Sequence, residues 1–157
     1  MRTFSLFAQM AESAEGRGDT LPKSIRQLCL AYNRDADHID LFCQFCHKPL
    51  SILDKICFDH AKLTLLWRDG SPRGVCVLCA RILARVEFTQ RHEVSCSAQQ
   101  AAQYIGSSLE EAVVRCLRCL TPLQRQEKAL LVRDNRTVHK VWGTWRAPCV
   151  RCMIGLF

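Results

Sequence analysis

Four Cys-x-x-Cys pairs constrain the fold of this 157-residue chain more than any other feature. Within each half of the chain, 29 residues separate the first pair from the second, and all four cysteines of the first two pairs recur 73 positions later. Other residues match at the same offset, so a whole module is duplicated. The pairs are Cys43/Cys46, Cys76/Cys79, Cys116/Cys119 and Cys149/Cys152, and the further matches include Pro49 with Pro122, Lys55 with Lys128 and Gly70 with Gly143.

The spacing of the cysteines predicts zinc. Two residues between a pair of cysteines let a tight turn present both thiolates to one ion, and two such turns complete a tetrahedral site with no position left for water. We therefore expect two structural Zn²⁺ ions. Cys43, Cys46, Cys76 and Cys79 would bind one ion, and Cys116, Cys119, Cys149 and Cys152 would bind the other.

Two other uses of these cysteines are weaker hypotheses. An iron–sulfur cluster is the one serious rival metal group. The segment from Cys43 to His47 matches the C-x-x-C-H haem attachment pattern, but its copy ends in Leu120 and lacks the histidine. Of the three cysteines outside the pairs, Cys29 and Cys57 are expected to be small buried apolar residues, and Cys96 an exposed thiol.

The size of the modules and the compartment agree with this interpretation. Modules of about 60–70 residues are marginal on hydrophobic burial alone and often rely on a metal. No segment resembles the apolar core of a signal peptide, and none approaches the length of a membrane span. We therefore expect a reducing compartment, thiolates on zinc and no membrane partner.

The net charge of +7 is concentrated towards the C-terminus. The segment 111–157 carries nine Lys or Arg residues against three acidic ones, which gives +6. Such a surface attracts anionic partners, either nucleic acid or an acidic peptide. A solvated basic face without a partner explains the same charge.

The predicted fold class is α+β, with two homologous zinc modules that each contain a three-stranded sheet and short helices, joined by a long helix. Residues 1–20 are expected to be disordered, 21–80 to form the first module, 81–97 the connecting helix and 98–157 the second module. Further predictions are a helix from Ile25 to Asn33, strands at 55–58 and 63–67, a helix opened by Ser107 and Ser108, and a hairpin of segments 129–132 and 137–142.

The complete pattern resembles the papillomavirus early protein six, a two-zinc viral oncoprotein, over roughly Leu21 to Cys152. Beyond the cysteine spacing, the supporting residues are Leu63, the run Trp67-Arg68-Asp69-Gly70, Arg115 before the third pair, and Gly143-x-Trp145 before the fourth pair. The resemblance implies a protein without enzymatic activity. It also implies a pocket that captures acidic helical LxxLL motifs of host proteins, and action in the host cytoplasm and nucleus.

Residue by residue, the resemblance assigns the peptide-binding pocket to Phe45, Leu63, Leu66, Arg68, Val75, Leu83 and Arg115. One branch of the family recruits a HECT-type ubiquitin ligase and directs p53 to degradation. Another binds mastermind-like coactivators and represses Notch signalling. Trp142 and Thr144 stand where high-risk mucosal members carry arginines, which favours the mastermind-binding branch. The C-terminal Ile154-Gly-Leu-Phe157 lacks the Ser or Thr that class I PDZ ligands need.

Several alternatives stay open at the level of sequence. The apolar segment around Leu63 and Leu66 suits either a core or a groove wall. A nucleic-acid-binding zinc protein is the competing function, although the aromatic residues are not interleaved with basic ones as in a stacking platform. Weak nucleic-acid binding and weak self-association are both compatible with the adaptor. An enzyme is the least favoured class, because the chain has no phosphate-binding glycine loop, nucleophile elbow or open His/carboxylate metal site.

Overall fold

The computed structural model describes residues 21–155, so the disorder expected for residues 1–20 lies outside the described part of the chain. The chain divides between Ala80 and Arg81 into two compact units. No helix in the described range is both long and apolar enough to cross a membrane.

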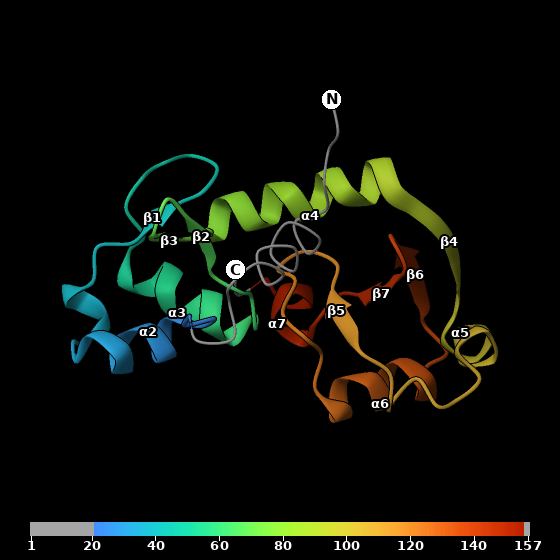
Figure 1. Cartoon of the computed structure of the whole chain (residues 1–157). Coiled ribbons are helices and arrows are strands. Elements are labelled where there is room, and N and C mark those ends of the chain that lie inside the picture. Colours follow the sequence, from blue (N-terminus) through green and yellow to red (C-terminus); the bar gives the residue numbers. More distant parts are fainter. Residues whose placement is uncertain (1–20, 156–157) are drawn as a thin grey trace. The chain divides into compact units, whose positions relative to one another are not determined.

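The first unit combines two helices with a small sheet (Figure 1). Strand β1 runs parallel to the central strand β3, and β2 pairs with the other side of β3 in the antiparallel sense, giving the order β1-β3-β2. Its elements are α2 (Ile25–Tyr32), the 3-10 helix η1 (Ala36–His38), β1 (Phe42–Cys43), α3 (Ile52–His60), β2 (Leu66–Arg68) and β3 (Ser71–Gly74). Helix α4 (Val77–Arg91) begins at the end of this unit and continues into the second.

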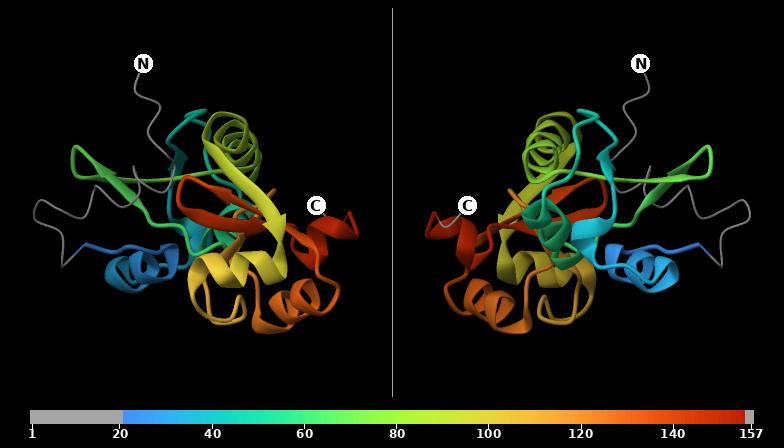
Figure 2. Two further views of the ribbon diagram at one scale, coloured as in Figure 1. Left: turned by 90° about the vertical axis from the view of Figure 1, so that its right-hand side faces the viewer. Right: turned by 90° about the vertical axis from the view of Figure 1, so that its left-hand side faces the viewer.

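The second unit repeats this arrangement and adds a strand. Its sheet has the order β4-β6-β7-β5, with β5 parallel to β7 and the other pairs antiparallel. Helices α5 and α6 lie side by side along the sheet (Figure 2). The elements are β4 (His92–Ser97), α5 (Ala98–Ile105), β5 (Val114–Cys116), α6 (Arg125–Arg133), β6 (Thr137–Val141), β7 (Thr144–Ala147) and α7 (Val150–Met153). The predicted three-stranded sheet is therefore correct for the first unit and one strand short for the second.

Individual hydrogen bonds of the first unit recur in the second, between residues that lie 73 positions further along the chain. The buried ammonium of Lys55 donates to the carbonyl of Ile39 at 2.7 Å, and that of Lys128 donates to the carbonyl of Ala112 at 2.8 Å. A buried lysine needs such partners because an unpaired charge in the interior is costly. Conservation of this contact between the two units explains why the two lysines are a matched pair in the sequence.

Positive backbone φ angles recur as well. His47 (59°) matches Leu120 (64°), and the Asp69-Gly70 turn between β2 and β3 matches Trp142-Gly143 between β6 and β7. Two successive residues with positive φ form the turn that suits the twist of a two-residue hairpin. Asp and Gly adopt positive φ angles readily, whereas the φ of 46° at Trp142 is sterically unfavourable for a bulky side chain.

Several predicted elements are wrong. Residues 55–58 and 129–132, expected as strands, lie inside helices α3 and α6. These segments are too short for their apolar pattern to distinguish the period of a helix from that of a strand. The deciding signal is the helix cap, where Ser51 accepts from the backbone N–H of Asp54 in a capping box. No helix directly follows Ser107 and Ser108: the chain there forms turns that lead into β5, and the Ala-rich helix α5 ends before them, at Ile105. The connecting helix stops at Arg91, and 92–97 form β4 rather than helix.

Each unit has its own apolar core. In the second unit, residues of α5 and α6 pack on the sheet together with the zinc-ligand cysteines; this cluster includes Ala98, Ala101, Leu109, Val114, Leu131, Val138, Trp145 and Ala147. In the first unit the largest fully buried side chains include Leu28, Leu41 and Phe58. Gly74 lies in a closely packed part of this core, where a Cβ would meet the side-chain ends of Leu50 at 2.9 Å and Leu41 at 3.3 Å.

Candidate metal centres

The first cysteine of each set ends a strand and opens a tight turn. Cys43 is the last residue of β1, and its carbonyl accepts from the N–H of His47 at 3.0 Å. Cys116 ends β5, and its carbonyl accepts from Leu120 at the same distance. The positive φ of His47 and of Leu120 closes each turn, so that the second cysteine of each pair points back towards the first.

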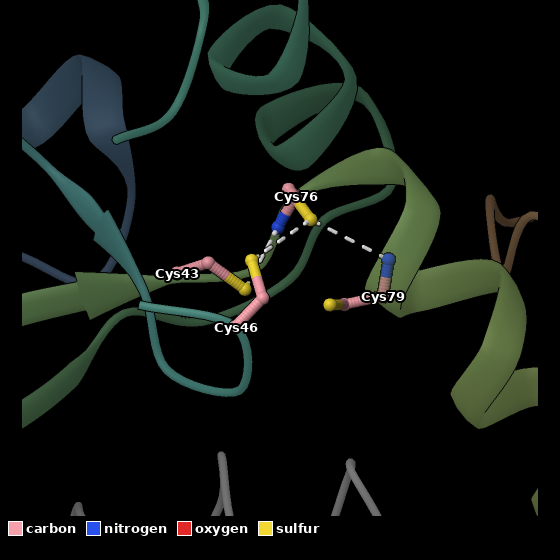
Figure 3. A group of neighbouring side chains, drawn as sticks. All are labelled: Cys43, Cys46, Cys76 and Cys79. Carbon is pink, nitrogen blue, oxygen red and sulfur yellow. Dashed lines mark hydrogen bonds between the residues drawn. The ribbon is translucent and has the colours of Figure 1, made fainter. Parts of the chain in front are cut away.

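The second pair of each set lies where a helix begins. Cys76 immediately precedes α4, and Cys79 lies in its first turn. The backbone N–H of Cys76 donates to Cys43 Sγ at 3.5 Å, and that of Cys79 donates to Cys76 Sγ at 3.4 Å (Figure 3). N–H groups at a helix start favour anionic sulfur, and in this set they lower the pKa of Cys43, whereas burial outweighs them and raises the pKa of Cys76.

The four sulfur atoms of each set converge. All ligand atoms within a set lie within 4.8 Å of one another. The Sγ atoms of Cys46 and Cys76 are 3.9 Å apart, and those of Cys119 and Cys149 are 3.8 Å apart. A tetrahedral ion with Zn–S bonds of about 2.3 Å requires sulfur separations of about 3.8 Å. Both sets therefore fit a structural zinc ion, as the spacing predicted.

Charge in the two clusters is uneven. Burial opposes ionisation of Cys43, but the backbone N–H groups of Cys46 and Cys76 outweigh it and lower its pKa to about 7. The pKa of Cys116 is lowered to about 4, because the side chain of Cys119 and nearby backbone N–H groups donate to its sulfur. Burial raises the pKa of Cys149 to about 11. One thiolate therefore forms readily, and the dication must displace protons from the others, which makes zinc affinity dependent on pH.

A carboxylate joins each centre to the neighbouring helix. Asp54 Oδ1 accepts from the N–H of Val77 at 2.8 Å, and Glu127 Oε1 accepts from the N–H of Val150 at 2.9 Å. Hydrogen bonds from Ser51 and Val77 outweigh burial and lower the pKa of Asp54. Each carboxylate fixes the helix that carries the fourth cysteine of its set. The sequence analysis missed this pair, although the 73-residue offset relates them.

The residues assigned to a peptide-binding pocket differ widely in exposure. Leu63, Leu66 and Val75 are 5%, 2% and 2% exposed and contribute to the core of the first unit. Phe45 is half-buried and Arg68 is exposed. In the second unit, Leu83 and Arg115 are half-buried, and Arg115 Nη1 donates to the carbonyl of Leu120 at 3.1 Å. Their assembly into one pocket stays a prediction.

The cysteines outside the two sets are less simple than expected. Cys29 and Cys57 are half-buried rather than buried, and Cys96 packs against the core of the second unit instead of being exposed. Burial raises the pKa of Cys96, which argues against a nucleophile.

Two further clusters of the second unit were not predicted. One is the buried ion pair of Glu87 and Arg146, and the other joins His92, Ser95 and His139. Each cluster unites segments that are distant in the sequence, so no local pattern could have revealed it.

Comparison with known proteins agrees with the fold and the metal centres. The model of the family described as Early Protein (E6) matches residues 43–152. Protein E6 of human papillomavirus type 41 is 49% identical over 136 residues, which are 87% of this chain and 87% of that protein. Protein E6 of human papillomavirus 33 is 33% identical over 131 residues, 83% of this chain and 88% of that protein.

Among solved structures, the C-terminal zinc-binding domain of the HPV51 oncoprotein E6 is 28% identical, with a TM-score of 0.36, and covers 41% of this chain and 88% of that domain. The family match spans all eight predicted zinc ligands, from Cys43 to Cys152. The chain belongs to the Early Protein (E6) family of papillomaviruses.

Proposed function

We propose that this protein is a non-enzymatic adaptor that binds acidic LxxLL helices of host proteins in the cytoplasm and nucleus of the infected cell. Membership of the E6 family with both zinc centres intact is the observation that carries the proposal. The preferred ligand is a mastermind-like coactivator, and a HECT-type ubiquitin ligase is the second. Binding would then alter host transcription, differentiation and apoptosis.

Charge supports an acidic ligand. The chain has a net charge of +7, which favours association with anionic segments through long-range attraction. Among the pocket residues, Arg68 is exposed at the end of β2 and is able to pair with a carboxylate of the ligand. Phe45 offers a half-exposed aromatic ring, the kind of side chain that often anchors an apolar helix face.

The buried pocket residues contribute in a different way. Leu63, Leu66 and Val75 hold the fold of the first unit, so their truncation would disturb stability together with binding. Arg68 and Phe45 are therefore the better probes of binding.

Titration of fluorescent peptides tests the proposal. Two labelled acidic LxxLL peptides, one from a mastermind-like coactivator and one from the ubiquitin ligase, are titrated with zinc-loaded protein, and polarisation is measured. We expect the mastermind peptide to bind more tightly, and Arg68→Glu to weaken binding. Arg26→Glu is the matched control, since it makes the same charge change at an exposed residue outside the predicted pocket.

Two results would contradict the adaptor. One is equal binding of peptides whose three leucines are replaced by alanine. The other is no binding of either peptide by protein that retains two zinc ions. A labelled oligonucleotide in the same assay tests the competing function, whose affinity would fall steeply with salt.

A further inference from the structure

Two histidines of the second unit direct a ring nitrogen at the same point. His92 Nε2 lies 2.7 Å from Ser95 Oγ, and His139 Nδ1 lies 2.7 Å from the same oxygen. A hydroxyl carries one proton, so it donates to one ring at most and must accept from the other. The two nitrogens, which come from different strands, are therefore separated by no more than twice this distance.

A bulge in β4 creates this convergence. Ser95 is paired directly with His139 on the neighbouring strand, so both side chains project from the same face. His92 lies three residues before Ser95 and would point to the opposite face in a regular strand. Between His92 and Val94, however, two steps along β4 correspond to one step along β6. The extra residue, Glu93, returns His92 to the face of the other two.

The bulge is held in place by side-chain contacts. Glu93 Oε1 accepts from the N–H of Gly143 at 2.5 Å, and Glu93 Oε2 lies 3.5 Å from Lys140 Nζ. The ring of Phe88 in α4 contacts both imidazoles, with centroid distances of 5.1 Å to His92 and 5.2 Å to His139. Both histidines thus project from paired strands, with their rings oriented by packing against Phe88. His92 is exposed and His139 is half-buried, so ions in solution can reach them.

We propose that His92 and His139 form a third metal site, for an exchangeable transition-metal dication such as Zn²⁺. Neutral imidazole is a preferred zinc ligand, bound at about 2.0–2.1 Å. Two nitrogens on one ion are therefore about 4 Å apart or less, and small side-chain rotations of the two histidines suffice to reach this separation. The ion takes the point now occupied by Ser95 Oγ, and water fills the remaining positions.

The surrounding charges permit a dication. Arg146 is the cross-strand neighbour of His139, but its guanidinium pairs with Glu87 at 2.6 Å. Lys140 is likewise close to Glu93. Two imidazoles and water make a weaker and more exchangeable site than four thiolates, so this site is separate in kind from the two structural centres.

Zinc stoichiometry tests the proposal on the full-length protein with both structural centres loaded. The protein is dialysed against a series of buffered free zinc concentrations, and bound zinc is counted by atomic spectroscopy. The wild type is expected to bind a third ion, with an affinity reduced about tenfold or more in His92→Gln and in His139→Gln. His38→Gln, which alters an exposed histidine of the first unit, retains the third ion. Ser95→Ala binds it at least as tightly, since the hydroxyl no longer occupies the site.

Imidazole ¹H–¹⁵N spectra of the wild type give a readout that does not depend on the folding of variants. We expect the ring signals of His92 and His139 to shift together as the third ion binds, while those of His38 stay unchanged. Retention of three zinc ions by the double variant of His92 and His139 would overturn the proposal. Ring signals of His92 and His139 that do not move, or loss of the third ion in Ser95→Ala, would also overturn it.

Discussion

Glu87 supports a buried arginine, and its replacement offers the sharpest test of how the second unit is stabilised. The side chain of Arg146 is 0% exposed and that of Glu87 is 7% exposed, with 2.6 Å between Arg146 Nη2 and Glu87 Oε2. Arg115 is the cross-strand neighbour of Arg146, and burial together with the Arg146 charge lowers the pKa of Arg115. Glu87 therefore supplies one negative charge to a region that contains two guanidinium groups.

Removal of one partner of a buried ion pair leaves a desolvated charge, which costs about 3–5 kcal/mol. Glu87→Gln keeps the shape and one hydrogen-bonding oxygen, so we expect the lower end, about 3 kcal/mol. Replacing Glu87 and Arg146 together by methionine should cost about 1 kcal/mol or less, because the desolvation penalty disappears with the pair. The difference between these variants isolates the cost of the stranded charge.

Urea unfolding at saturating zinc measures these values. A Trp67→Phe background leaves the tryptophan fluorescence signal to Trp142 and Trp145, both in the second unit. The control is Glu110→Gln, which breaks a partly exposed ion pair with Arg125 (N–O distance 3.5 Å) and should cost about 1 kcal/mol or less. If Glu87→Gln costs no more than this control, the buried pair does not stabilise the unit as argued.

Three further predictions concern the first unit and the metal. Leu63→Ala should lower the free energy of unfolding by about 2–4 kcal/mol, whereas Leu53→Ala, at an exposed position, should lower it by less than about 1 kcal/mol. Equal melting temperatures of the two variants would place Leu63 outside the core. Asp54→Asn should lower the free energy of unfolding by about 1–2 kcal/mol, equally at pH 6 and pH 8. The pKa of Asp54 is lowered from 3.8, so the stability that its carboxylate contributes is lost only in more acidic solution. A loss that differs between the two pH values, or that is no larger than the loss in Asp37→Asn, would contradict this. A zinc chelator should abolish the near-ultraviolet circular dichroism of both units; folded, zinc-free protein would refute a structural role.

The zinc centres were predictable because their signal is local. A pair of cysteines two residues apart needs only one tight turn, and the 73-residue offset relates every ligand of the first set to one of the second. The same offset extends to features that the sequence did not reveal, such as the carboxylates of Asp54 and Glu127. Each carboxylate acts on the first residue of a helix, Val77 of α4 or Val150 of α7. The position of that helix start beside the carboxylate is a property of the folded unit.

The secondary structure was less predictable where helix and strand patterns coincide. Segments 55–58 and 129–132 are only four residues long and mostly apolar, so they show neither period clearly, and capping interactions decide that they are helical. At 92–97, the chain leaves a helix for a strand because backbone pairing with β6 is available in the folded unit. No pattern within these six residues indicates that partner.

By itself, the sequence determined the duplicated module, the eight zinc ligands, the basic charge and the family, because each of these depends on residue type and spacing. Only the tertiary structure decided that Leu63 is core, that Glu87 neutralises Arg146, and that His92 meets His139. Burial and convergence depend on the packing of segments that lie far apart in the chain. A bulge of one residue reverses the face on which a side chain lies, and this geometry exists only once the strands have paired.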